Sequence, residues 1–272
     1  MDNRPIGVMD SGLGGLSVMR IMRQQMPQES LIFVGDQGHF PYGTKSATEI
    51  RRFALNIGHF LVRHHVKLMV VACNTATAEA LPLLQTKLPI PVIGVVQPGA
   101  RAAIAANNHQ RIGVIATTAT TATGIYPRAL HQLSPNVTVF PLATQPLVTI
   151  VEHRQTGTAK AQQLVDRQLS PLAGKQLDAL IMGCTHFPFL QMEFRKTLGS
   201  SVALIDPAEE TVKQVQDYLR DHKLLAGANR RGRVRLYSTG SAVHLTQGAR
   251  GWLHDSTLFG HHVELAESKD LE

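Results

Sequence analysis

The chain has 272 residues, of which 43% are hydrophobic and 17% are charged. This composition supplies enough apolar surface for one large domain or two modest ones, and it excludes a mainly disordered or collagen-like chain. No apolar run approaches the roughly 18 residues that a membrane-spanning helix needs. The first apolar run, Ile6–Met9, is too short for the core of a signal peptide. We therefore expect a cytoplasmic protein without membrane contact.

The chain has two cysteines and a formal net charge of +7, and both limit the functions that it can have. Cys73 and Cys184 are too few for a disulfide scaffold, so packing, metal binding and catalysis remain as their roles. The positive charge favours an anionic substrate. The densest basic run, residues 230–235, is accompanied by no nucleic-acid-binding motif and is interpreted as a solvated loop. Nucleic-acid binding is therefore not expected.

Short β-branched runs alternate along the chain with stretches that repeat apolar residues every 3.6 positions, as in parallel strands joined by helices. In chain order, the expected strands are Ile6–Asp10, Leu31–Asp36, Leu68–Cys73, Val92–Val96, Arg111–Ala116, Val137–Phe140, Ala179–Gly183, Val202–Asp206 and Val234–Ser238. A capping box over Ser46–Glu49 predicts a helix that continues to Leu61. A second helix is expected after Pro207, with one apolar face formed by Val212, Val215 and Leu219.

The pattern also contains an internal repeat. Ile6–Ser11 is echoed by Ile112–Thr117, and Leu68–Thr75 is echoed by Ala179–Thr185, at nearly equal offsets. Buried strands commonly share Ile, Val and Gly, but a cysteine at the same strand end favours a true repeat. We predict an α/β fold of two similar parallel-sheet domains related by pseudo-symmetry, with the active site at their interface. The expected limits are 1–96 plus 208–272 for the first domain and 97–207 for the second.

Each cysteine follows an apolar strand and precedes a helix, which is where parallel α/β sheets bind ligands. The positive end of such a helix can lower the pKa of a thiol from about 8.5 into the range of roughly 3.5–7.5. Two such thiols on facing domains would flank one substrate. Racemisation needs this arrangement, because one base removes a proton from a stereocentre and an acid returns one on the other face. We therefore expect Cys73 and Cys184 to be the two acid–base groups.

Polar residues near the two strand ends are candidates to assist the thiols. Asp10 ends the first strand and His186 lies two residues after Cys184, so one half offers a carboxylate and the other an imidazole. Either side chain could instead cap a helix or be a satisfied buried group. Asp36 and Glu152 are weaker candidates, because a strand-end aspartate and a surface glutamate are both common.

Loops near the expected site offer groups that could bind carboxylates. The turn Ser11–Gly15 resembles an anion-binding turn at a helix start, but it matches neither nucleotide-binding glycine motif. Pro41–Thr44 presents a tyrosine hydroxyl and backbone amides. The matching place in the second half supplies the hydroxyls of Thr117, Thr118, Thr120 and Thr121. The pairs His64–His65 and His261–His262 are interpreted as surface residues, and no metal is expected.

Four ordered motifs make the pattern specific: MDSGLGGLSV from Met9, DQGHFPYG from Asp36, VVACNTATA from Val70 and MGCTHFP from Met182. Together they resemble the motifs of bacterial glutamate racemases, within the aspartate/glutamate racemase family. Aspartate racemases of that family usually have Glu where His186 stands. The resemblance implies a cofactor-independent isomerase that interconverts L- and D-glutamate. It also implies a supply of D-glutamate for peptidoglycan, and hence a role in cell wall biogenesis and cell shape.

The resemblance assigns roles to the motif residues. Asp10 would assist Cys73, and His186 would assist Cys184. Substrate contacts would come from Asp10, Ser11, Pro41, Tyr42, Gly43, Asn74, Thr75, Thr185 and His186, with Thr118 and Thr121 as further candidates. A homodimer is also expected. Four alternatives stay open: an aspartate racemase, a thiol redox protein, a zinc enzyme using both cysteines and His186, and a basic nucleic-acid-binding protein.

Overall fold

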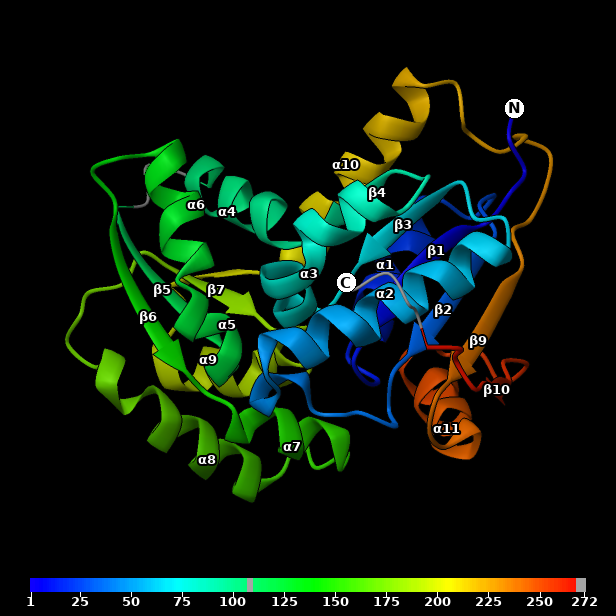
Figure 1. Cartoon of the computed structure of the whole chain (residues 1–272). Helices are drawn as coiled ribbons and strands as arrows, with labels where there is room; N and C mark the ends of the chain where they lie inside the picture. Colours follow the sequence, from blue (N-terminus) through cyan, green and yellow to red (C-terminus); the bar gives the residue numbers. More distant parts are fainter. Residues whose placement is uncertain (107–109, 268–272) are drawn as a thin grey trace.

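The computed structural model describes residues 1–106 and 110–267 as an α/β protein with two parallel sheets (Figure 1). The first sheet has the strand order β10-β9-β2-β1-β3-β4 and the second has the order β6-β5-β7-β8. The first sheet is built from β1 (Ile6–Asp10), β2 (Leu31–Gly35), β3 (Leu68–Val71), β4 (Val92–Gly94), β9 (Val234–Ser238) and β10 (Gly260–His262). The second is built from β5 (Arg111–Ala116), β6 (Thr138–Ala143), β7 (Ala179–Gly183) and β8 (Ala203–Ile205). The predicted fold class is confirmed.

Helices cover both faces of the first sheet, because successive side chains of a strand point to opposite faces. Ile6 and Val8 of β1 face one core, whereas Met9 faces the other. The first core is closed by α1 (Leu16–Gln25), α10 (Pro207–Asp221) and α11 (Ala242–Trp252), and the second by α2 (Ala47–Arg63) and α3 (Asn74–Lys87). Both faces of β1 are therefore dry, which explains its uninterrupted apolar sequence.

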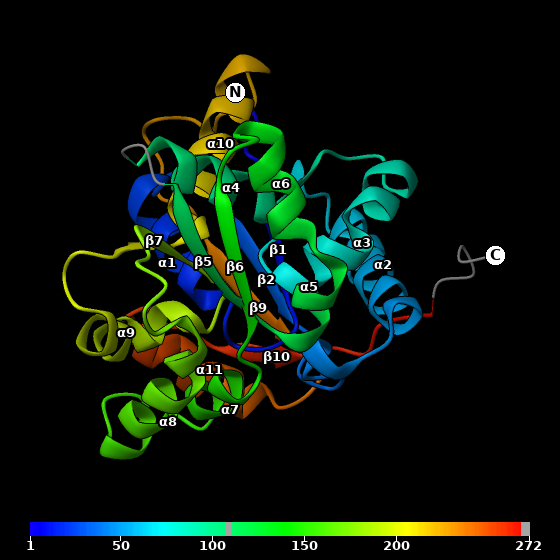
Figure 2. The ribbon, with the colours of Figure 1, turned by 90° about the vertical axis from the view of Figure 1, so that its left-hand side faces the viewer.

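The second sheet is covered in the same way, and its strands β5, β6 and β7 can be followed in Figure 2. One core contains residues of α4 (Val96–Ala105) and α6 (Ile125–Leu133). The other contains residues of α7 (Pro146–Glu152), α8 (Ala159–Leu169), the 3₁₀ turn η3 (Phe187–Leu190) and α9 (Gln191–Leu198). Short helices α5 (Thr118–Thr123), η1 (Tyr42–Thr44) and η2 (Ser170–Leu172) complete the described part of the chain.

The chain passes between the sheets twice. After β4 it enters α4, whose residues Val96, Ala100 and Ala103 pack in a core of the second sheet. After β8 it enters α10, which returns to the first sheet and packs against both α1 and α4. The segment beyond residue 207 thus adds α10, β9, α11 and β10 to the first sheet. The exact domain limits 1–96 plus 208–272 and 97–207 stay a prediction.

Several predicted strand limits were wrong. The strand expected at Val137–Phe140 runs instead from Thr138 to Ala143 through Pro141, which is tolerated because β6 is an edge strand paired only with β5. Other strands are shorter than expected: β2 ends at Gly35, β3 at Val71 and β4 at Gly94, and β8 covers only Ala203–Ile205. The short strand β10 was not expected, because its sequence, Gly-His-His, carries no apolar signal.

The two helices expected from capping signals are present. Ser46 Oγ accepts the amide of Glu49 at 3.3 Å, and Glu49 Oε2 accepts the amide of Ser46 at 3.0 Å, so the capping box opens α2 as predicted. The carboxylate of Asp206 caps α10, and the predicted apolar face of that helix is buried. No helix of the described residues is long and apolar enough to cross a membrane.

Candidate active site

A cavity between the carboxyl ends of the two sheets is lined by both cysteines. Cys73 follows β3 and Cys184 follows β7, and each is a buried free thiol. The cavity also brings together eight of the nine residues predicted to contact substrate: Ser11, Pro41, Tyr42, Gly43, Asn74, Thr75, Thr185 and His186. The ninth, Asp10, lies directly behind them and accepts a hydrogen bond from Thr185 Oγ1 at 3.1 Å. The carboxyl ends of the two sheets therefore bring the motif residues together around one cavity.

Cys73 caps the N-terminus of α3. Its Sγ accepts the amide of Ala76 at 3.4 Å and lies 3.7 Å from Ser11 Oγ. The expectation that the helix start would lower the pKa of this thiol is wrong. Burial, followed by the charge of Asp10, raises the pKa of Cys73 to about 12, and the helix contact offsets only part of that rise. Desolvation of the charged form outweighs the helix field here.

Cys184 begins a chain of three buried groups. Its Sγ lies 3.6 Å from His186 Nδ1, and His186 Nε2 lies 2.6 Å from Glu152 Oε1 at the end of α7. Burial disfavours the imidazolium, but the contacts with Cys184 and Glu152 outweigh it and raise the pKa of His186 well above its ordinary value. Burial likewise disfavours the carboxylate, yet the bond to His186 lowers the pKa of Glu152. The pair is therefore an imidazolium and a carboxylate beside a sulfur.

Glu152 was expected on the surface, and that expectation is wrong. Only 8% of the residue is exposed, and its Oε1 also accepts the amide of Leu13 at 2.9 Å. A signal for this burial was present in the sequence. Glu152 lies one helical turn after Val148, which lines the cavity, and follows the buried residues Ile150 and Val151.

The turn Ser11–Gly15 does bind anions, but they are carboxylates of the protein itself. The amide of Gly12 donates to Asp10 Oδ2 at 3.0 Å, as the amide of Leu13 does to Glu152. The pKa of Asp10 is nevertheless raised, because burial outweighs the influence of His186 and of these hydrogen bonds. The turn therefore fixes the two buried carboxylates of Asp10 and Glu152.

Glycine is required at Gly14 because the two halves meet there. A Cβ atom on Gly14 would lie 2.6 Å from His186 Nδ1 and would also overlap the hydroxyl of Thr185. Real Cβ atoms essentially never approach other atoms this closely. The absence of a side chain at this position lets the imidazole approach the first-half turn.

The loop Pro41–Thr44 lies in the cavity wall, but its tyrosine hydroxyl does not serve as expected. Tyr42 donates to Asp36 Oδ2 at 2.5 Å, and Asp36 also accepts Thr239 Oγ1 at 2.6 Å. Burial, together with the charge of Asp36, raises the pKa of Tyr42 well above its ordinary value, so the hydroxyl remains a donor. Asp36 is thus a buried anchor of the loop and is not among the residues that line the cavity.

Of the four threonines predicted near the site in the second half, only Thr117 lines the cavity. The Thr117 hydroxyl forms a triangle of hydrogen bonds with Thr75 and Thr120 at 2.9–3.0 Å. Thr118 is exposed, and Thr121 has a buried hydroxyl without a hydrogen-bond partner among the described residues. The structure therefore brings Thr117, rather than Thr118 or Thr121, to the cysteines.

Tyr126 is a site residue that the sequence analysis missed. It comes from α6 and donates its buried hydroxyl to Asn74 Oδ1 at 2.6 Å. Burial raises the pKa of Tyr126, so it stays a neutral donor. Because Asn74 Oδ1 is engaged, its amide nitrogen is the end left to donate into the cavity. A tyrosine 52 residues along the chain, within an ordinary amphipathic helix, carries no local signal of this contact.

Metal ligation is not supported by the arrangement of the described residues, which contain no group of three or more His, Cys, Asp or Glu side chains able to hold an ion. His64 Nδ1 contacts the carbonyl of Phe60, while His261 and His262 are exposed on β10. The described residues thus place no ligand set beside the two cysteines.

Comparisons with known proteins agree with this site. Residues 6–215 match the Asp/Glu/Hydantoin racemase family. The chain is 58% identical to the glutamate racemase of Limosilactobacillus fermentum, over 93% of this chain and 94% of that protein. The crystal structure of glutamate racemase isoform RacE1 from Bacillus anthracis superposes with a TM-score of 0.93 at 40% identity, over 97% of this chain and 99% of that one. Glutamate racemase from Francisella tularensis, solved in complex with D-glutamate, gives 0.88 at 33% identity, over 98% of both chains.

The chain therefore belongs to the Asp/Glu/Hydantoin racemase family. Within that family its high-identity relatives are glutamate racemases, so it is an enzyme of the isomerase class.

Proposed function

We propose that the protein interconverts L- and D-glutamate without a cofactor, by proton transfer at Cα between Cys73 and Cys184. The observation that carries this proposal is the placement of two buried free thiols, at equivalent strand ends of two sheets, in the wall of one cavity. The relative from Francisella tularensis, which binds D-glutamate, supports the choice of substrate.

The chemistry needs only the two sulfurs at the reacting carbon. One cysteine, as thiolate, removes the Cα proton, and the electron pair of the broken C–H bond stays on Cα next to the carboxylate. The other cysteine, as thiol, gives its proton to the opposite face of Cα. The first sulfur ends protonated and the second ends as a thiolate. The reverse reaction exchanges these roles.

The two thiolates are stabilised differently. The imidazolium of His186, held by Glu152, places a positive charge 3.6 Å from Cys184 Sγ. Cys73 has no such cation, and its pKa of about 12 keeps it protonated near neutral pH. The α-ammonium group of a bound amino acid would supply one, since an opposite charge within ~4–6 Å shifts a pKa by ~1–3 units. We infer that Asp10 helps to accept or orient the Cys73 proton.

Binding requires the cavity to enlarge. Its free volume is about 10 Å³, which is room for a single water molecule. Glutamate is much larger, so we infer that the cavity widens to admit it. Its carboxylates would then meet the amide nitrogen of Asn74, the hydroxyls of Thr75, Thr117 and Thr185, and the backbone of Gly43.

The wider role follows from the product. D-glutamate is a building block of peptidoglycan, and we propose that the enzyme supplies it for cell wall biogenesis. A homodimer and a cytoplasmic location stay predictions.

The test is incubation with L-glutamate in deuterated water without pyridoxal phosphate. Loss of optical rotation together with deuterium at Cα is expected, and L-aspartate under the same conditions should react far more slowly. Optical activity that never decays would refute the proposal, and faster reaction with aspartate would reassign the substrate.

Single-cysteine variants test the assignment of the two faces. Cys73→Ala and Cys184→Ala should each abolish racemisation. A glutamate analogue with a leaving group at the β-carbon needs only one base, so each variant should still eliminate from one enantiomer. The two variants should retain opposite enantiomers. Retention of the same enantiomer by both would contradict the two-face mechanism.

A further inference from the structure

A groove separate from the cysteine cavity collects positively charged side chains. It lies between α1, the start of β9 and the end of α11, and it encloses about 300 Å³. Arg20, Arg23 and Arg231 line it, and none of them lines the cysteine cavity. This volume is at the lower end of the roughly 300–1,000 Å³ of small-molecule sites.

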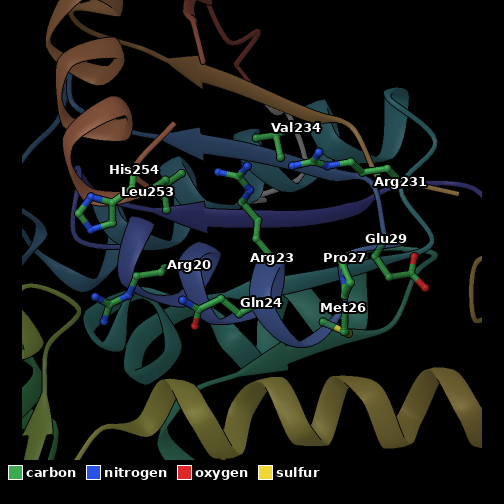
Figure 3. A pocket seen from close by; sticks show the side chains of 11 residues that line it. Arg20, Arg23, Gln24, Met26, Pro27, Glu29, Arg231, Val234, Leu253 and His254 are labelled. Atoms are coloured by element: carbon green, nitrogen blue, oxygen red, sulfur yellow. The ribbon is translucent and has the colours of Figure 1, made fainter. Parts of the chain in front are cut away.

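Two guanidinium groups in the groove point toward one another (Figure 3). Arg23 comes from α1 and is fixed by an ion pair with Asp255 at 2.7 Å, with both side chains largely buried. Arg231 precedes β9 and makes no ion pair or side-chain hydrogen bond with any residue of 1–106 and 110–267. Its place is nevertheless set by the backbone, because the amide of Gly232 donates to the carbonyl of Pro27 at 2.9 Å. Of the two like charges, only that of Arg23 is paired with a carboxylate.

The acidic residue that lines the groove does not neutralise it. Glu29 is buried, and its carboxylate accepts Lys67 Nζ at 2.6 Å and the amide of Ala226 at 2.8 Å. In Figure 3 its carboxylate points away from the two guanidinium groups. At the other end of the groove Arg20 makes no ion pair within the described ranges, although it lies within electrostatic reach of Asp206. The lining therefore has an excess of positive charge.

We propose that this groove binds a small molecule that carries a phosphate group, with the phosphate between the guanidinium groups of Arg23 and Arg231. Guanidinium forks pair with phosphate oxygens through two parallel hydrogen bonds. A phosphate monoester carries about −1.5 to −2 charges at neutral pH, so it can match two arginines where a single carboxylate cannot. A polynucleotide would need a longer continuous basic surface than this groove offers.

Isothermal titration of the full chain with inorganic pyrophosphate tests the proposal. Saturable binding of one pyrophosphate per chain is expected at moderate ionic strength. Arg231→Gln should weaken it about tenfold, because a charge-assisted contact is lost. The matched control is Arg230→Gln, which removes the same charge from the adjacent residue. Arg230 bonds Ser30 Oγ at 2.8 Å and does not line the groove, so affinity should be kept.

Three results would overturn the proposal. The first is the lack of saturable pyrophosphate binding. The second is equal weakening by both variants, which would show a diffuse positive field. The third is tighter binding of a short single-stranded DNA that pyrophosphate fails to displace, which would indicate a polyanion surface instead. Arg231 has no partner to lose, so its variant should fold, and unchanged racemisation by Arg231→Gln confirms that it does.

Discussion

Glu152→Gln isolates the charge that supports His186. Glutamine has nearly the same shape, and its side-chain oxygen can still accept from His186 Nε2 and from the amide of Leu13, which lie 2.6 Å and 2.9 Å from Glu152 Oε1. Only the negative charge is removed. A neighbouring opposite charge is worth ~1–3 pKa units, or ~1.4–4 kcal/mol, so the pKa of His186 should fall by that amount.

The loss of this charge should lower kcat more in one direction of racemisation than in the other. Without its carboxylate the imidazole is neutral over more of the pH range, so the Cys184 thiolate loses its counter-ion. In the direction that uses Cys184 as base, kcat should fall about 10- to 100-fold and should fall further as pH rises past the new pKa. The equilibrium constant between free enantiomers is one, so kcat/KM must fall equally from both sides. The asymmetry can therefore appear only in kcat and KM separately.

The assay is the initial rate of optical rotation change from each enantiomer between pH 6 and pH 9, with the imidazole followed by nitrogen NMR. Glu193→Gln is the matched control, because Glu193 is also buried and bonded to a backbone amide, that of Gly157, but it is not the carboxylate that pairs with His186. Equal kcat losses in both directions with no change at His186 would refute the reasoning, while leaving the two-thiol mechanism intact.

Three further outcomes follow from the contacts around the site. Tyr126→Phe frees Asn74 to turn its amide, so KM should rise about tenfold with little change in kcat; a loss confined to kcat would contradict a binding role. Burial raises the pKa of Asp206 to about 6 from 3.8, so its stabilising contribution is present below pH 3.8 and is lost as pH rises through 6. Asp206→Asn should therefore raise the free energy of unfolding in urea by up to about 3 kcal/mol at pH 7 but not at pH 3, and equal effects at both would exclude the carboxyl group as the cause. Gly14→Ala should cost about 1–3 kcal/mol and most of the activity because its Cβ overlaps the imidazole. Gly227→Ala is the control and should melt like the parent, because its Cβ would meet only the side chains of Met1 and Asn3 at ordinary contact distances.

The features of the site that could be predicted from the sequence are those that depend on neighbouring residues in the chain. The strand ends that carry Asp10, Cys73 and Cys184 were predicted because apolar runs followed by polar residues mark the binding edge of a parallel sheet. Glu152 was placed on the surface because the pairing partner, His186, lies 34 residues further along the chain and meets it only through the packing of α7 against η3.

Other failures came from competing effects of similar size. The helix start beside Cys73 suggested a lowered thiol pKa, but complete burial and a nearby carboxylate act in the opposite direction and dominate. The hydroxyl of Tyr42 was assigned to substrate because Asp36, six residues earlier, was not recognised as its acceptor. Both outcomes depend on solvent exclusion, which a sequence pattern does not quantify.

The double crossing of the chain between its sheets has a mechanical consequence. Two bodies joined at two neighbouring points have one easy relative motion, a rotation about the line through both points. Here the joints are the entries into α4 and α10, which pack against each other at the upper edge of Figure 1, whereas α7 lies at the lower edge. The two sheets should therefore rotate relative to each other about this line, with the smallest displacement at α4 and α10. The largest displacement should occur where Gly43 meets Gln145 and Thr117, and this is where the two domains would separate to admit glutamate.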